Sequence, residues 1–286
     1  MARVLITGKN GQLGQALIEQ LERNGDTVIA TDKEEMDITD VASCAQVLDA
    51  EKPEVLINTA AYNLVPACED NPMPAFQVNT FAVQNLAKLC AEREIQFVTY
   101  SSDYVFDGTA TQSYEEDAMT RPLQMYGISK RAGELACMNE NPSAVLIRTA
   151  SLYGGEHGSP VKGNFVLSML KAAKENKRLE VGDESRMSPT YAVDLATATL
   201  QLLEKKAEGG IYHLTNEGDC SWAGFAAKIM EAKGLNMKIV PVERKEKSGD
   251  MHRPAYSVLN NKKARKMGVV LPSWEDAIER YVKTLP

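Results

Sequence analysis

A tyrosine and a lysine lie four residues apart in the stretch YGISK, as Tyr126 and Lys130. In a helix this spacing places both side chains on one face, a turn apart. A free tyrosine has a pKa of about 10, and a neighbouring ammonium stabilises the phenolate and lowers that pKa. The pair therefore predicts proton transfer to a carbonyl oxygen, although Tyr and Lys also fall at this spacing by chance in many helices.

A serine that suits the same chemistry, Ser102, lies in YSSDYVF, just after the apolar run 96–100. Residues that follow a strand of a parallel sheet lie at its carboxyl edge, where ligands bind in this architecture. From there the Ser102 hydroxyl would donate to a substrate carbonyl beside Tyr126. The alternative is a turn or a helix cap. Both signals in one α/β chain favour catalysis.

The glycine-rich stretch GKNGQLG spans residues 8–14. An ATPase phosphate loop needs Gly-Lys followed by Ser or Thr, whereas Lys9 is followed by Asn10. Gly8, Gly11 and Gly14 instead lie between a predicted strand and helix, and Asp32 ends the next strand. This pattern predicts a dinucleotide site, with the pyrophosphate at the helix N-terminus and Asp32 on the adenosine ribose. Asp32 favours NAD, and Lys33 beside it leaves NADP open.

The elements that would position these residues alternate along the first half of the chain. Apolar runs at 3–6, 28–31, 54–58, 96–100 and 144–148 predict buried strands, and amphipathic stretches at 12–25, 41–51, 75–94 and 127–138 predict helices. This alternation predicts an α/β fold with a Rossmann-type doubly wound parallel sheet.

The pattern is less regular after residue 150. We expect a Gly-rich loop at 153–164, helices at 165–176, 192–204, 221–233 and 273–285, a short strand and a loop within 178–191, the apolar segment 211–215 and a basic stretch at 243–254. The predicted organisation is a dinucleotide-binding domain at 1–150 and a smaller substrate-binding region at 151–286, interleaved with the Rossmann core.

Composition excludes several classes of function. Lys and Arg number 32 and Asp and Glu 39, a net charge of −7, which argues against nonspecific binding to nucleic acid or anionic membranes. No apolar run approaches the roughly 20 residues of a membrane span, and no signal peptide is apparent. Five scattered cysteines without paired spacing indicate reduced thiols and a cytoplasmic protein. Three distant histidines predict no metal site.

These residues carry a resemblance to the extended short-chain dehydrogenase/reductase superfamily: the glycine loop, the strand-end serine and the Tyr-x-x-x-Lys pair. Within it, the chain resembles the dTDP-4-dehydrorhamnose reductase family nearly end to end. The similar stretches are LITGKNGQLG, DIT, NTAAYNLVPACE, YSSDYVFDG, YGISKRAGE, IRTASLYG, KGNFVLSML, SPTYAVDLA, IYHLTNEGDCSWAGFA and RPAYSVLN.

The resemblance implies roles for residues at matching positions. It implies NADH or NADPH as cofactor, Ser102, Tyr126 and Lys130 as the catalytic set, and support of the lysine by Asn79 through water. The cofactor-binding residues would be Gly8, Gly11, Gln12, Leu13, Gly14, Asp32, Asp37, Ile38, Ala61, Tyr62, Asn63, Tyr100, Tyr126 and Lys130. The substrate-facing residues would be Ser102, Asp103, Ser151, Asn164, Arg186 and Arg253; for Arg253 a loop ion pair is an equal alternative.

Two segments depart from the family's pattern. The family commonly has a tryptophan that packs on the sugar where this chain has Ser151, and its DQxGxPT loop is replaced by ESRMSPT at 184–190, which brings in Arg186. An aromatic wall contributes about 0.5–1.5 kcal/mol beyond area burial, so these changes would reshape the sugar subsite and leave hydride transfer intact.

The resemblance implies reduction of a nucleotide-linked 4-keto-6-deoxysugar, with dTDP-4-dehydro-L-rhamnose as the first candidate. Related dehydratases have a Glu after the strand-end Asp, and here Tyr104 follows Asp103. A regulatory subunit like that of methionine adenosyltransferase and a nucleotide-sugar epimerase remain alternatives. We expect a monomer or homodimer with a nucleotide-sugar substrate and no nucleic-acid or membrane partner.

Overall fold

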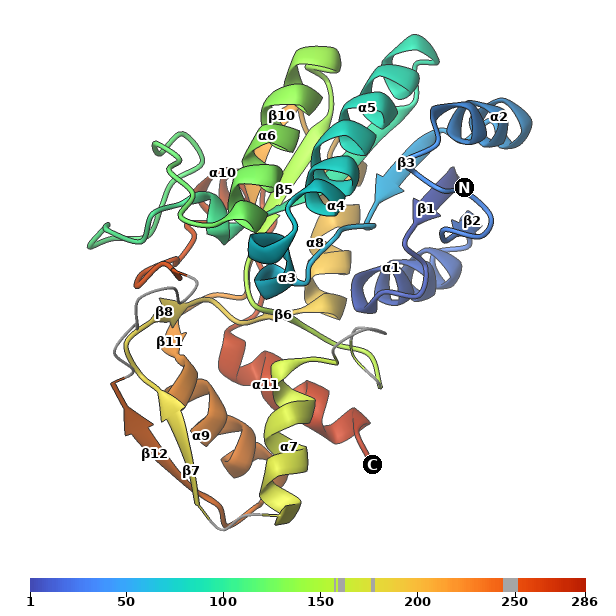
Figure 1. The fold of residues 1–286 in the computed structure, drawn as a ribbon. Coiled ribbons are helices and arrows are strands. Elements are labelled where there is room, and N and C mark those ends of the chain that lie inside the picture. Colours follow the sequence, from blue (N-terminus) through green and yellow to red (C-terminus); the bar gives the residue numbers. More distant parts are fainter. Residues whose placement is uncertain (157, 159–162, 176–177, 244–251) are drawn as a thin grey trace.

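A parallel sheet forms the centre of the computed structural model, which describes residues 1–156, 158, 163–175, 178–243 and 252–286 (Figure 1). Its strands are β1 (Arg3–Thr7), β2 (Thr27–Thr31), β3 (Val55–Asn58), β4 (Gln96–Ser102), β5 (Val145–Thr149) and β10 (Gly210–His213). They lie in the order β10-β5-β4-β3-β1-β2, and every neighbouring pair is parallel. The predicted doubly wound sheet is confirmed. Because β2 and β3 lie on opposite sides of β1, a crevice is expected at the carboxyl ends near β1.

The five predicted strands all form. β1, β3, β4 and β5 are largely buried, as their runs of Val, Ile and Leu predict, whereas the edge strand β2 is only partly buried. β4 continues past the predicted end at 100 and reaches Ser102. The segment 211–215 contributes β10, which pairs with β5 at the edge of the same sheet.

Helices cover both faces of the sheet. α1 (Gln12–Arg23) and α8 (Ala192–Glu204) pack on one face, against a core that includes Val4 and Ile6. α2 (Val41–Glu51), α5 (Val83–Glu92) and α6 (Met125–Glu140) pack on the other, around Leu5. This alternation along β1 follows from the two-residue period of a strand.

The prediction of one regular α-helix at 75–94 is wrong, because the helical stretch changes its hydrogen-bonding type along its length. The helical stretch consists of α4 (Met73–Phe76), the π-helical segment η1 (Gln77–Ala82) and α5. The π-helical segments of proteins occur frequently at functional sites. A short helix before it, α3 (Val65–Asp70), and a 3₁₀ turn after β4, η2 (Asp103–Val105), were not expected from the sequence.

A second core lies beyond the carboxyl edge of the sheet. α7 (Phe165–Glu175), α9 (Trp222–Lys233) and α11 (Trp274–Thr284) pack around Tyr153, Phe225 and Tyr281. A parallel pair, β7 (Arg178–Gly182) with β12 (Lys238–Val242), packs against α9. Two further strand pairs have two residues in each strand. They are β6 (Leu152–Tyr153) with β9 (Thr190–Tyr191), and β8 (Arg186–Met187) with β11 (Cys220–Ser221). β12 and the short helix α10 (Lys262–Lys266) were not expected.

Parts of three sequence predictions lie outside the described residues. These are residues 157 and 159–162 of the loop 153–164, the end of the helix 165–176 and most of the basic stretch 243–254.

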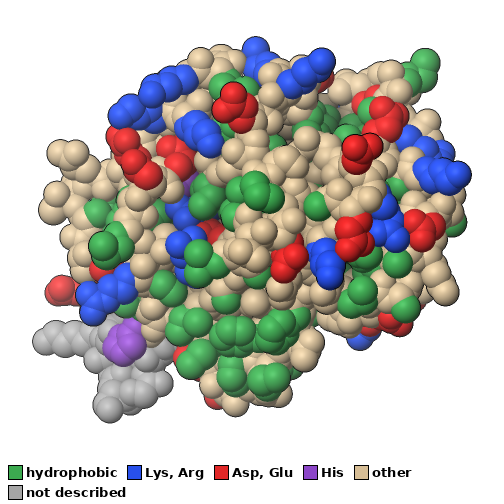
Figure 2. All heavy atoms as spheres, turned by 90° about the horizontal axis from the view of Figure 1, so that it is seen from above, with side chains coloured by type: hydrophobic (Ala, Val, Ile, Leu, Met, Phe, Trp, Pro, Cys, Tyr) green, Lys and Arg blue, Asp and Glu red, His purple; other side chains and the backbone are tan. Residues whose placement is uncertain are grey.

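The surface seen from above carries acidic and basic side chains interspersed, with no extended basic patch (Figure 2). In the part of the chain that the structure describes, no helix is long and apolar enough to cross a membrane. All five cysteines are buried thiols that take part in no disulfide. Across the same described ranges, His, Cys, Asp and Glu side chains form no group of three or more that could hold a metal ion.

Candidate active site and dinucleotide trough

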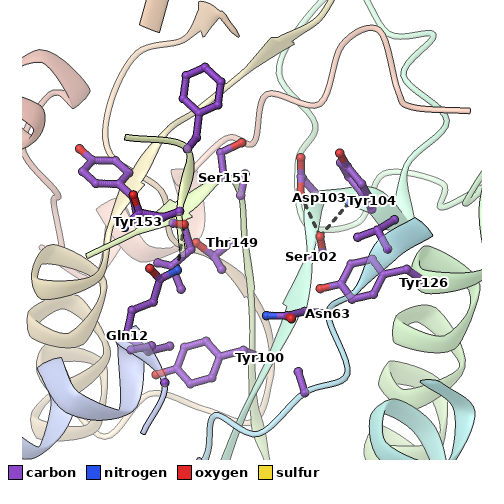
Figure 3. A pocket seen from close by; sticks show the side chains of 18 of the residues that line it. Gln12, Asn63, Tyr100, Ser102, Asp103, Tyr104, Tyr126, Thr149, Ser151 and Tyr153 are labelled. Atoms are coloured by element: carbon purple, nitrogen blue, oxygen red, sulfur yellow. Dashed lines mark hydrogen bonds between the residues drawn. The ribbon is translucent and has the colours of Figure 1, made fainter. Parts of the chain in front are cut away.

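A cavity of about 430 Å³ lies between the carboxyl edge of the sheet and the second core (Figure 3). The glycine loop, the ends of β4 and β5, the start of α6 and side chains of α7 and α9 line it. Ser102, Tyr126 and Lys130 all lie in its wall. The structure thus brings the three predicted catalytic side chains together.

The start of α6 fixes Tyr126, the second residue of the helix. Gln124 caps the helix, because its Oε1 accepts from the backbone N–H of Gly127 at 2.6 Å. The Glu69 carboxylate accepts from the backbone N–H of Met125, also at 2.6 Å. These caps hold the first turn of the helix beside the end of β4.

Ser102 serves the local fold as well as the cavity. Its hydroxyl accepts from the backbone N–H of Tyr104 at 3.2 Å, which makes it the N-cap of η2. The same hydroxyl donates to Asp103 Oδ1 at 2.9 Å. Ser102 therefore forms the helix cap that was the alternative to a catalytic role, and it also lies in the cavity wall.

Lys130 is buried, with 6% of its surface exposed, and its Nζ donates to the backbone carbonyl of Tyr100 at 3.1 Å. Burial lowers the pKa of Lys130 to about 8, against a smaller opposing effect of the Glu134 carboxylate. The ammonium is thus tied to the end of β4.

The predicted lowering of the Tyr126 pKa is wrong for this structure. Burial raises the pKa of Tyr126 well above 10, the charge of Asp103 raises it further, and a hydrogen bond with Ser102 lowers it by a smaller amount. The main cause is burial of the phenol, which disfavours the charged phenolate, and the Lys130 ammonium is bonded to the carbonyl oxygen of Tyr100.

Asp103 is buried, with 3% exposed, next to the candidate catalytic residue Ser102. Burial raises its pKa from 3.8 to about 6, although hydrogen bonds from Ser257 and Ser102 favour the charged form. Its neighbour Tyr104 meets the ring of Tyr126 edge to face, with 6.1 Å between the ring centroids.

The buried side chain of Asn79 connects two parts of the candidate site. It accepts from the backbone N–H of Tyr62 at 2.9 Å and donates to the carbonyl of Tyr62 at 3.0 Å. It also donates to Ser129 Oγ at 3.1 Å, and that hydroxyl donates to the carbonyl of Tyr126. Asn79 therefore connects the loop after β3 to the start of α6 through protein atoms, and its support of Lys130 through water stays a prediction.

A second cavity of about 440 Å³ adjoins the first. Four residues line both: Gly11, Thr59, Ala61 and Asn63. The second cavity also contains Gly8, Asp32, Asp37 and Ile38, and the first contains Gln12, Leu13 and Tyr100. The two cavities together form a continuous trough along the carboxyl edge of β1, as the predicted dinucleotide site requires.

The glycines of the loop are needed for close approach. Gly8 has φ +78°, which side chains rarely adopt, and a Cβ there would lie 2.8 Å from Thr59 Oγ1. A Cβ on Gly14 would lie 2.3 Å from the carbonyl oxygen of Gly8. Gly14 lies outside both cavities and allows α1 to pack against the loop.

Several predicted contact residues have their side chains engaged elsewhere. The Asn164 amide donates to the Gly154 carbonyl at 3.2 Å and to the Tyr281 hydroxyl at 3.0 Å, and its Oδ1 accepts from Leu167 N–H, so this wall residue supports the fold. Arg186 pairs with Asp219 and lies outside both cavities. Tyr62 also lies outside them.

Ser151 lies in the first cavity, and Arg253 lies near Tyr104 of that cavity. Ser151 lines the first cavity with φ +44°. Arg253 is exposed, and its charge partly offsets the effect of burial, which raises the pKa of Tyr104 to about 12.

Sequence reasoning missed other cavity residues, notably Thr59, Thr149, Phe165 and Trp222. Thr59 follows β3 and Thr149 ends β5, so the strand-end rule that selected Ser102 would also have found both threonines. No local signal distinguishes Phe165 and Trp222 from ordinary core aromatic residues.

The parallel sheet, the glycine loop and the strand-end cavity define a Rossmann-type dinucleotide-binding protein. A family model described as RmlD substrate binding domain matches residues 2–286. The chain belongs to this family.

Relatives match along nearly the full length. The chain is 38% identical over 283 residues to the spore coat polysaccharide biosynthesis protein SpsK of Bacillus subtilis (strain 168), covering 99% of this chain and 98% of that protein. It is 36% identical to a dTDP-4-dehydrorhamnose reductase of Aggregatibacter actinomycetemcomitans, covering 98% of each. The crystal structure of a dTDP-4-dehydrorhamnose reductase from Bacillus anthracis str. Ames in complex with NADP superimposes with a TM-score of 0.92 at 33% identity, covering 99% of both chains.

Proposed function

We propose that this protein reduces the keto group of a nucleotide-linked 4-keto-6-deoxysugar with NADH or NADPH, and that its substrate is dTDP-4-dehydro-L-rhamnose, which becomes dTDP-L-rhamnose. The observation that carries the proposal is the convergence of Tyr126, Ser102 and Lys130 in one cavity that continues into the glycine-loop trough. At the coarser level, the chain is an NAD(P)H-dependent oxidoreductase of the reductase family to which its relatives belong.

The trough suits a dinucleotide because its floor lacks side chains where a pyrophosphate must approach the backbone. Gly11 lies where the two cavities meet, at the N-cap of α1, where the helix dipole favours anions. Asp32 and Asp37 at the far end would hold the adenosine half, and Lys130 the nicotinamide ribose. When bound, the reduced nicotinamide supplies a hydride to the keto carbon.

Tyr126 would protonate the oxygen of the former ketone. Its raised pKa keeps the phenol protonated at neutral pH, which is the state that a proton donor needs before reduction. Ser102 would donate a hydrogen bond to the substrate carbonyl and hold it beside the phenol. The Lys130 ammonium, close to the same strand end, would stabilise the phenolate once the proton has left.

The substrate would enter from the side of Asp103 and Tyr104. The single carboxylate at this strand end, without a following Glu, suits hydride transfer better than elimination. Arg253 is exposed beside Tyr104 and would meet the phosphates of the sugar nucleotide.

The test is to measure NADH and NADPH consumption with a panel of nucleotide-linked 4-keto sugars. We expect turnover with dTDP-4-dehydro-L-rhamnose and loss of turnover in Tyr126→Phe. Copurification with a partner enzyme and no oxidation of either cofactor on any sugar would instead support a regulatory subunit. Tightly held NAD in the purified protein, with interconversion of sugar epimers, would support an epimerase.

A further inference from the structure

Buried polar atoms without a hydrogen-bond partner gather around the catalytic cavity. Within the described ranges there are five such side-chain atoms. Four of them belong to residues that line this cavity: Gln12 Oε1, Ser101 Oγ, Thr149 Oγ1 and Tyr153 Oη. A buried polar group without a hydrogen-bond partner has lost its hydration with no compensation, so the concentration of these atoms here indicates groups that await a ligand.

Among these four residues, Thr149 lies at the end of the strand that neighbours Ser102. It is the last residue of β5 and pairs in register with Ser102, the last residue of β4. Neighbouring strands lie about 4.8 Å apart, so the Thr149 hydroxyl lies close to the place where Ser102 and Tyr126 would hold the ketone.

The two sides of the cavity differ in their residues. Gln12, Tyr100, Thr149 and Ser151 lie on one side, and Ser102, Asp103, Tyr104 and Tyr126 on the other (Figure 3). The side with Thr149 continues from the glycine loop, because Gln12 Nε2 donates to the carbonyl of Leu152 at 2.9 Å and holds β6 to the N-terminus of α1. A dinucleotide that runs from Asp32 past Gly11 would therefore place its last group, the nicotinamide, against this side.

We infer that the Thr149 hydroxyl binds the carboxamide of the nicotinamide ring; the inference rests on the proposed use of NAD(P)H. A primary carboxamide carries an acceptor oxygen and donor N–H groups, and a threonine hydroxyl complements either one. This contact fixes the rotation of the ring about its bond to ribose, and with it the direction in which the hydride-bearing carbon faces the ketone.

The test is a binding comparison that uses Thr149→Val, in which a methyl group of similar size replaces the hydroxyl. Calorimetric titration of NADH and of ADP-ribose, which lacks the nicotinamide, separates the contact from the rest of the trough. We expect the Kd of NADH to rise about fivefold to tenfold, the effect of one lost hydrogen bond. The Kd of ADP-ribose should stay at the wild-type value.

Two further variants make the comparison specific. Thr149→Ser retains a hydroxyl and should restore NADH binding. Thr197→Val removes an exposed hydroxyl on α8 that donates to the Val193 carbonyl at 2.9 Å, and should change neither Kd. Because the Thr149 hydroxyl has no hydrogen-bond partner among the described residues, Thr149→Val should also leave the melting temperature of the ligand-free protein unchanged or raised.

Three results would overturn the inference. They are an unchanged Kd for NADH in Thr149→Val, an equal loss for NADH and ADP-ribose, and a lowered melting temperature that accounts for the weaker binding. Since these titrations use no sugar substrate, a wrong assignment of the sugar would leave them unaffected and would be detected only in the turnover panel.

Discussion

The Nζ of Lys130 donates to the backbone carbonyl oxygen of Tyr100 at 3.1 Å, and the hydroxyl of Tyr100 pairs with the hydroxyl of Thr199 on α8 at 2.9 Å. Helix α6, the end of β4 and a helix on the opposite face of the sheet are thereby connected. Burial in this position lowers the pKa of Lys130 to about 8. The charge that the proposed mechanism uses is thus retained at neutral pH and lost in mildly basic solution.

Activity should therefore decline as the pH rises through about 8, because Lys130 is charged below its pKa and neutral above it. Lys130→Met should lower kcat/KM by roughly a hundredfold, within the range for loss of acid–base assistance, and should lack this decline. The measurement is kcat/KM for the sugar between about pH 6 and about pH 9.5. A decline of the same shape in Lys130→Met would assign it to another group.

Asp103 should make the protein less stable as the pH rises through about 6. Its folded-state pKa is raised from 3.8 to about 6, so the stability that it contributes is fully present below about pH 4 and is lost above about pH 6. Asp103→Asn removes this dependence. The free energy of unfolding in urea, wild type minus variant, should fall between these two pH values.

Asp107→Asn is the matched control for this measurement. The pKa of Asp107 is lowered, chiefly by the backbone N–H of Thr109, so its contribution has the opposite sign and is lost as the pH falls. If the difference for Asp103→Asn stayed constant from pH 4 to pH 7, the raised pKa of the buried carboxyl would be refuted.

Gly14→Ala should disrupt the contact of α1 with the glycine loop. The new Cβ would lie 2.3 Å from the Gly8 carbonyl oxygen, so backbone must move. We expect a loss of about 1–3 kcal/mol in the free energy of unfolding and weaker NADH binding. Gly224→Ala in α9, where the nearest atom is the Ser221 hydroxyl at 3.3 Å and no backbone atom is as close, should be neutral or slightly stabilising. Equal stability of the two variants would contradict the packing role of Gly14.

Local patterns were sufficient for the sheet and for much of the candidate site. Short apolar runs predict the strands, and the carboxyl ends of parallel strands lie at one edge of the sheet. The sequence alone therefore predicts that Ser102 and the glycine loop lie at the same edge. Tyr126 and Lys130 could be placed on one face of a helix because residues four apart are neighbours on a helix surface.

Long-range partners could not be predicted in this way. The spacing of Tyr126 and Lys130 does not say which atom the ammonium meets, and that atom is a carbonyl oxygen 30 residues away along the chain. Asn164 is engaged by Tyr281, 117 residues away, and Arg186 by Asp219. The π-helical segment that directs Asn79 toward Ser129 likewise has no signature in the apolar periodicity.

The role of Tyr126 as proton donor is tested most directly by the rate of the first turnover in Tyr126→Phe. NADH and dTDP-4-dehydro-L-rhamnose are mixed beforehand, and the enzyme is then added rapidly to this mixture, in which both are saturating. The phenylalanine keeps the ring contact with Tyr104 and removes only the proton donor. NADH oxidation should be slower by at least about a hundredfold, with NADH binding unchanged. Oxidation at the wild-type rate would show that the proton comes from elsewhere and would refute the role of Tyr126 as proton donor.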